Sequence, residues 1–126
     1  MEFNRPDVVA EIAEVFAGYE AALVAGDNER LVGYFWDAPD LVRFGLADRQ
    51  SGGRELRAWR LAQPALPGRR LGDTTITAFG PDFAVVTTLF GYGDDPATGR
   101  QSQTWVRLPQ GWRIVHAHVS RPTPGM

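Results

Sequence analysis

Residues 82–121, DFAVVTTLFGYGDDPATGRQSQTWVRLPQGWRIVHAHVSR, decide the fold class, because apolar and polar side chains alternate through most of them with a period of two. Turn residues divide this stretch into expected strands at 82–92, 100–108 and 111–121, and an earlier strand is expected at 69–79. Consecutive strands joined by short turns pair antiparallel. The second half of the chain therefore predicts an antiparallel meander.

The first half of the chain has helical periodicity instead. Residues 6–25 predict an amphipathic helix, and shorter helices are expected at 28–35 and 54–62. A strand is expected at 41–46, followed by a turn at 48–53. Helices followed by a meander are typical of an α+β fold, with the helices covering one face of an antiparallel sheet.

The strands at 82–92 and 111–121 carry apolar side chains on both faces, as in Phe83–Val86 and Trp112–Val115. An antiparallel sheet needs only one dry face. We therefore expect the second face to meet another copy of the chain in a homodimer.

Composition excludes several classes of protein. The 126 residues, 44% of them hydrophobic, predict one domain over residues 1–126, and the net charge of −2 argues against nucleic-acid and membrane-surface partners. The apolar stretch 8–26 contains three glutamates, which excludes a membrane span. The chain has no cysteine, so a cytoplasmic location is expected. All 13 basic residues are arginine, which excludes lysine chemistry.

Two residues stand out as candidates for a site. Tyr19 lies on the apolar stripe of the first helix, where its simplest role is that of a core tyrosine with a hydrogen-bonded hydroxyl. Arg43 alternates with the apolar Val42 and Phe44. In a flat sheet Arg43 would be solvated, whereas in a curved sheet it would point into a cleft and bind a carboxylate through its planar guanidinium.

Two histidines, His116 and His118, are expected on one face of the last strand together with Trp112, Ile114 and Ser120. Such a pair can ligate zinc or iron, but a metal site needs a third protein ligand, and no metal-binding motif is present. We therefore expect no metal and no organic cofactor. Trp59, beside Arg60, is a candidate wall for a pocket that contains an arginine.

The order of elements, closing on residues 111–120, resembles the SnoaL-like, nuclear-transport-factor-like superfamily. That resemblance implies an α+β fold in which a curved, mostly antiparallel sheet wraps around the N-terminal helices to form a cone with a central pocket, and its members are commonly dimers. Residues 19–23, 31–36, 42–45 and above all 99–107 resemble the AtzH-like family more narrowly.

The AtzH-like resemblance implies a small, cofactor-free protein associated with the amidases of ureide and cyanuric acid breakdown. It implies decarboxylating amidohydrolysis of dicarboxyurea to allophanate. A tyrosine on the first helix and an arginine on the first strand are tied to this activity, and the matching positions are Tyr19 and Arg43. His118 and Ser120 fit the closing segment of the family pattern.

The leading hypothesis is therefore a hydrolase acting on a small anionic substrate. Tyr19 and Arg43 are its expected catalytic residues, and the expected substrate-binding residues are Trp59, Gln103, His118 and Ser120. A second hypothesis is a non-catalytic small-molecule binder or amidase-accessory subunit with the same pocket. A third is an isomerase or cyclase, which would need an acidic base deep in the cone.

Overall fold

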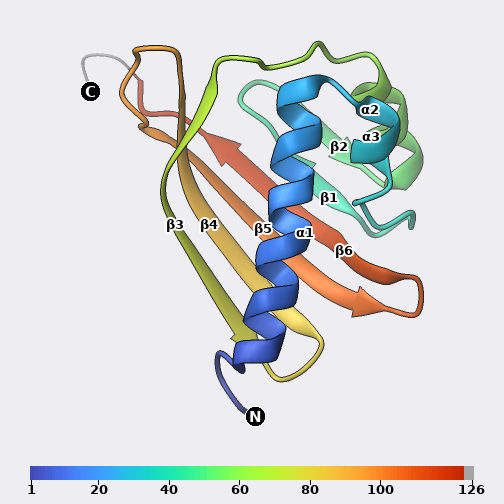
Figure 1. The fold of residues 1–126 in the computed structure, drawn as a ribbon. Helices are drawn as coiled ribbons and strands as arrows, with labels where there is room; N and C mark the ends of the chain where they lie inside the picture. The colour runs from blue at the N-terminus through green and yellow to red at the C-terminus, as the bar shows by residue number, and fades with distance from the viewer. Residues whose placement is uncertain (124–126) are drawn as a thin grey trace.

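A computed structural model describes residues 1–123 and shows a six-stranded mixed sheet that curves around one long helix (Figure 1). The spatial order of the strands is β2-β1-β6-β5-β4-β3. The helices are α1 (Pro6–Ala25), α2 (Asn28–Val32) and α3 (Gly53–Leu61), and the strands are β1 (Val42–Phe44), β2 (Arg49–Ser51), β3 (Arg69–Phe79), β4 (Phe83–Tyr92), β5 (Gly99–Leu108) and β6 (Gly111–Ser120).

Helix α1 forms the centre of the fold. Pro6 occupies its first turn, where a missing backbone N–H costs nothing, and Gly26 ends it in the left-handed conformation with φ of 72°. Its buried face packs on the inner face of the sheet and consists of Val8, Ile12, Phe16, Tyr19, Glu20, Ala22 and Leu23. Of the helices in residues 1–123, none combines the length and apolarity needed to cross a membrane.

Strands β3 to β6 form the expected meander, and β1 adds to it by pairing parallel with β6. The expectation of a plain turn at 48–53 is wrong, because Arg49–Ser51 pairs with β1 as strand β2 and buries Gln50. The expected helix at 28–35 is too long, since α2 ends at Val32 and Phe35 bridges to β6.

A bulge in β6 exchanges the faces toward which the side chains of its second half point. Trp105 pairs with Ile114 and the preceding Thr104 pairs with His116, so Val115 is an extra residue on β6. Ile114 and Ala117 are both buried on the inner face, whereas His116 is exposed. The expected single face for Ile114 and the two histidines is therefore wrong.

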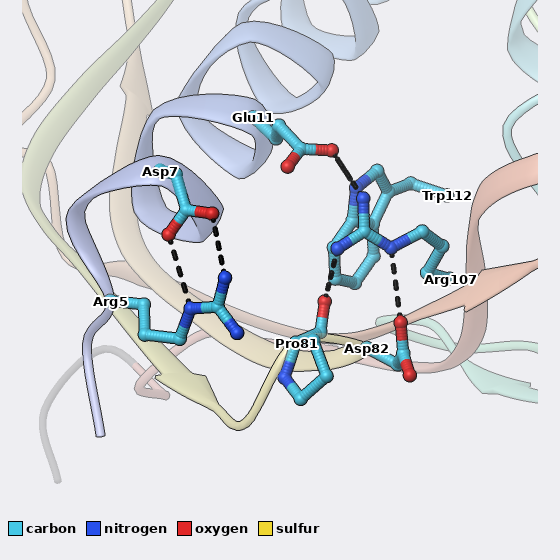
Figure 2. Close-up of polar contacts among 7 residues, drawn as sticks. All are labelled: Arg5, Asp7, Glu11, Pro81, Asp82, Arg107 and Trp112. Carbon is cyan, nitrogen blue, oxygen red and sulfur yellow. Dashed lines mark hydrogen bonds and ion pairs between the residues drawn. The ribbon is translucent and has the colours of Figure 1, made fainter. Parts of the chain in front are cut away.

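The N-terminal half of α1 is tied to the β5–β6 hairpin, which is itself tied to the turn between β3 and β4 (Figure 2). Arg107 of β5 donates to Glu11 of α1 at 2.6 Å and to Asp82 before β4 at 3.0 Å. The buried Trp112 indole N–H also donates to Glu11, at 3.1 Å. These contacts fix the start of α1, so its C-terminal half has a defined position at the other end of the sheet (Figure 1).

Candidate active site

A cavity of about 210 Å³ lies beside the C-terminal half of α1, with walls from α3, β1 and the ends of the long strands nearest them. It has roughly the volume of seven molecules of liquid water. Its lining residues are Tyr19, Leu23, Arg43, Leu46, Asp48, Trp59, Arg60, Gln63, Pro64, Leu66, Arg69, Phe90, Tyr92, Gln101 and Val119.

Arg43 reaches this cavity from β1, with only 12% of its side chain exposed. Its Nη1 donates to Gln50 Oε1 at 2.9 Å and to Asp48 Oδ2 at 3.3 Å, and Gln50 Nε2 donates to the same Asp48 oxygen. The guanidinium also lies against the Trp59 ring. Burial lowers the pKa of Arg43, and its interactions with Tyr19 and with the Asp48 carboxylate oppose that shift. The side chain is held by one nitrogen, so the rest of its donor edge can meet a ligand.

Arg60 on α3 is a buried cation, with 5% of its surface exposed. Its guanidinium carbon lies 4.5 Å from the Trp59 ring centroid, and no carboxylate within residues 1–123 forms an ion pair with it. Its buried Nε has no hydrogen-bond partner. Burial lowers the pKa of Arg60, as do the charges of Arg43 and Arg69.

The guanidinium of Arg69, at the start of β3, already makes several hydrogen bonds within the protein. It donates to both carboxylate oxygens of Glu20, at 2.7 and 3.2 Å, and to Gln101 Oε1 at 2.9 Å. Burial lowers the pKa of Arg69, but the hydrogen bond and charge of Glu20 outweigh burial, so the pKa is raised overall. Gln101 retains a buried Nε2 with no partner.

Tyr19 is 5% exposed and packs edge-on against Tyr34 and Phe35. Its hydroxyl has no hydrogen-bond partner in the part of the chain that the structure describes. Burial raises the pKa of the Tyr19 phenol, and Glu20 raises it further, while Arg60 and Arg69 act in the opposite direction. The phenol is therefore protonated at neutral pH.

The cavity has an excess of positive charge and of hydrogen-bond donors. Its three arginines face two carboxylates, those of Glu20 and Asp48, which leaves one positive charge in excess. Two of the three partnerless buried side-chain atoms in residues 1–123 are donors of this cavity, Arg60 Nε and Gln101 Nε2. A ligand that satisfies the cavity must offer acceptors and negative charge.

The structure brings together three of the six expected site residues, Tyr19, Arg43 and Trp59. His118 and Ser120 do not join them, because the bulge in β6 turns both toward the outer face, where the His118 ring contacts Phe44. Gln103 lies on the inner face, but it is enclosed in the core and its Oε1 accepts from Trp105 Nε1 at 3.1 Å.

Sequence reasoning missed Gln50, Arg69 and Gln101. Arg60 was named only as the neighbour of Trp59, although it follows the buried Leu56 by one helical turn and so shares its face. Within residues 1–123, no three His, Cys, Asp or Glu side chains are grouped closely enough to hold a metal ion.

The family is decided by one match. A model of the AtzH-like family covers residues 1–124. This chain belongs to the AtzH-like family. No curated protein matches it.

Several solved structures are similar to this AtzH-like chain. A cystatin-like fold protein from Burkholderia xenovorans LB400 is 48% identical, with 96% of each chain covered and a TM-score of 0.90. A protein of unknown function from Pectobacterium atrosepticum SCRI1043 is 44% identical over 96% of this chain and 95% of that one, with a TM-score of 0.89. An NTF2-like protein from Pseudomonas putida KT2440 shares the fold at 21% identity, with a TM-score of 0.78 over 96% and 91% of the chains.

Proposed function

We propose that this AtzH-like protein is a cofactor-free enzyme that removes carbon dioxide from a small carboxylated urea, converting dicarboxyurea to allophanate. The observation that carries the proposal is the cavity with a positive charge in excess, two partnerless buried donors and a protonated phenol. A dicarboxylated urea is planar, rich in acceptors and doubly negative, so it complements each of these features.

In this proposal Arg43 binds a substrate carboxylate and Tyr19 supplies a proton. The C–N bond to the departing carboxylate breaks, its electron pair stays on nitrogen, and the Tyr19 hydroxyl protonates that nitrogen. Carbon dioxide leaves, and the phenolate regains a proton from water, so one proton is consumed for each carbon dioxide released. The nearby guanidinium groups of Arg60 and Arg69 stabilise the transient phenolate.

Burial suits Tyr19 for this role. Because burial raises its pKa, the phenol retains its proton until the nitrogen becomes basic as the C–N bond breaks. The apolar walls, including Leu23, Leu66 and Phe90, keep the local dielectric low and so strengthen every charge interaction with the substrate.

The test measures turnover of freshly prepared dicarboxyurea directly. ¹³C NMR monitors the reaction, and the rate with the protein is compared with the rate without it. We expect wild type to accelerate formation of allophanate and carbon dioxide, and Tyr19→Phe to lose most of the acceleration while keeping its affinity. The matched control is Tyr34→Phe, which removes a phenol hydroxyl that accepts from Arg30 and belongs to a residue outside the cavity lining. Wild-type rates equal to the uncatalysed rate, with binding intact, would instead identify a binding or amidase-accessory protein.

A further inference from the structure

We propose that Arg60 and Gln101 form a second carboxylate-binding subsite in the cavity, separate from that of Arg43, so that the protein selects small ligands with two negative charges. The choice of a dicarboxylated ligand rests on the proposed function. Its prediction about ligand charge is independent of any turnover.

The first argument is the isolation of Arg60. A guanidinium that is 5% exposed and has no carboxylate partner in the described chain is costly to bury. Stacking on Trp59 offsets only part of that cost. A ligand carboxylate would supply the missing charge and an acceptor for the partnerless Nε.

The second argument is the orientation of Gln101. Arg69 has only donors, so the amide of Gln101 must present its oxygen to Arg69, and this leaves Nε2 as its free end. Arg69 is itself held by two hydrogen bonds to Glu20. Glu20 is thus a positioning residue that acts through Arg69 to make Gln101 a fixed donor.

The third argument is spacing. The guanidinium carbons of Arg43 and Arg60 both lie within 4.5 Å of the Trp59 ring centroid, so they are less than twice that distance apart. In a dicarboxylated urea only the N–C–N unit separates the two carboxylate carbons. One such molecule is therefore long enough to contact both guanidinium groups, and it is small enough for a cavity of about 210 Å³.

The experiment compares glutarate, a stable dianion with three atoms between its carboxylate carbons, with its monoamide glutaramate, which has nearly the same shape and one charge less. Calorimetry measures both affinities for wild type, Arg60→Met and Gln101→Glu. Arg54→Met is the control, since Arg54 is exposed on α3, the helix that also carries Arg60, and does not line the cavity. We expect wild type and the control to bind glutarate at least about tenfold more tightly than glutaramate.

In Arg60→Met we expect the affinities for glutarate and glutaramate to become about equal, mainly because glutarate binds more weakly. We also expect a higher melting temperature, because an unpaired buried charge is gone. Gln101→Glu retains an acceptor for Arg69 but adds negative charge, so it should also weaken glutarate binding. A preference that survives Arg60→Met, or equal wild-type affinities for the two ligands, would overturn the subsite. If carboxylated ureas are not turned over but the preference and its loss are observed, the proposed reaction fails and the subsite stands.

Discussion

The guanidinium carbon of Arg43 lies 4.0 Å from the centroid of the Trp59 indole ring, which places a cation of β1 against an aromatic side chain of α3. The same ring contacts the guanidinium of Arg60. Cation–π contact of this kind holds a guanidinium without neutralising it. Trp59 therefore contributes to the site by packing with the cations, not by hydrogen bonding.

Replacing Arg43 by lysine should lower kcat/KM about 100-fold, because an ammonium cannot reproduce the parallel hydrogen bonds of a guanidinium to a carboxylate. Steady-state kinetics on a carboxylated urea measure this effect. Arg54→Lys makes the same change at an exposed position of α3 outside the cavity and should leave kcat/KM unaltered. Near-normal activity in Arg43→Lys would show that the two-point contact is not used.

Gln50 is a positioning residue for Arg43, since its Oε1 accepts from Arg43 Nη1 at 2.9 Å. In Gln50→Leu the Arg43 side chain loses this acceptor, and we expect KM to rise about tenfold with a smaller change in kcat. The neighbouring Ser51→Ala is the control, because Ser51 is exposed. A change in melting temperature without a change in KM would assign Gln50 a purely structural role.

Tyr19 should make the protein sensitive to alkali. Its folded-state pKa is raised, so above the ordinary tyrosine pKa of about 10 the unfolded chain ionises Tyr19 while the folded chain still holds the proton. The free energy of unfolding should then fall by about 1.4 kcal/mol per pH unit between the two pKa values. Tyr19→Phe lacks this loss, so denaturation measured from pH 8 to 11 should show the stability of wild type falling relative to the variant above pH 10. Parallel curves would contradict a raised pKa.

Turnover should survive chelation. The proposed chemistry uses only a phenol and guanidinium groups, so prolonged treatment with EDTA followed by gel filtration should leave kcat unchanged. Loss of turnover that zinc or iron restores would contradict the cofactor-free reaction and direct attention to His116 and His118.

We expect a homodimer formed through the outer face of the sheet, where Val85 of β4 pairs with Thr104 of β5. Light scattering at micromolar concentration should give twice the monomer mass. Val85→Glu should lower that mass toward the monomer, whereas Arg100→Glu, which replaces an already charged side chain, should have a smaller effect. A monomeric wild type would refute the expectation.

The sequence predicted the elements with long, regular periodicity. Helix α1 and strands β3 to β6 lie within a residue or two of their expected bounds, because each has many buried positions in phase. Strand β2 was missed because it has three residues and buries only Gln50, which leaves no periodicity to detect. Its burial depends on pairing with β1 and on the contact with Arg43, neither of which is local.

The site was predictable only where one element determines a side chain's direction. Tyr19 follows from the phase of a single helix, and Arg43 from alternation in a curved strand. His118 was misplaced because one extra residue, Val115, reverses the alternation, and nothing in the sequence marks that residue. The link from Glu20 through Arg69 to Gln101 joins three separate elements, so only the tertiary structure could reveal it.

The parallel pairing of β1 with β6 sets the order in which the site can assemble. Val42 is aligned with His116, and in residues 1–123 the only other strand beside β1 is the three-residue β2. As the chain leaves the ribosome, β6 is the last strand to emerge, so the strand that carries Arg43 has no lasting neighbour until then. Arg43, which we propose as a ligand-binding cation, comes from the first half of the chain and is thus held in place by the second half. A ligand bound to Arg43 would in turn hold the closing strand against fraying.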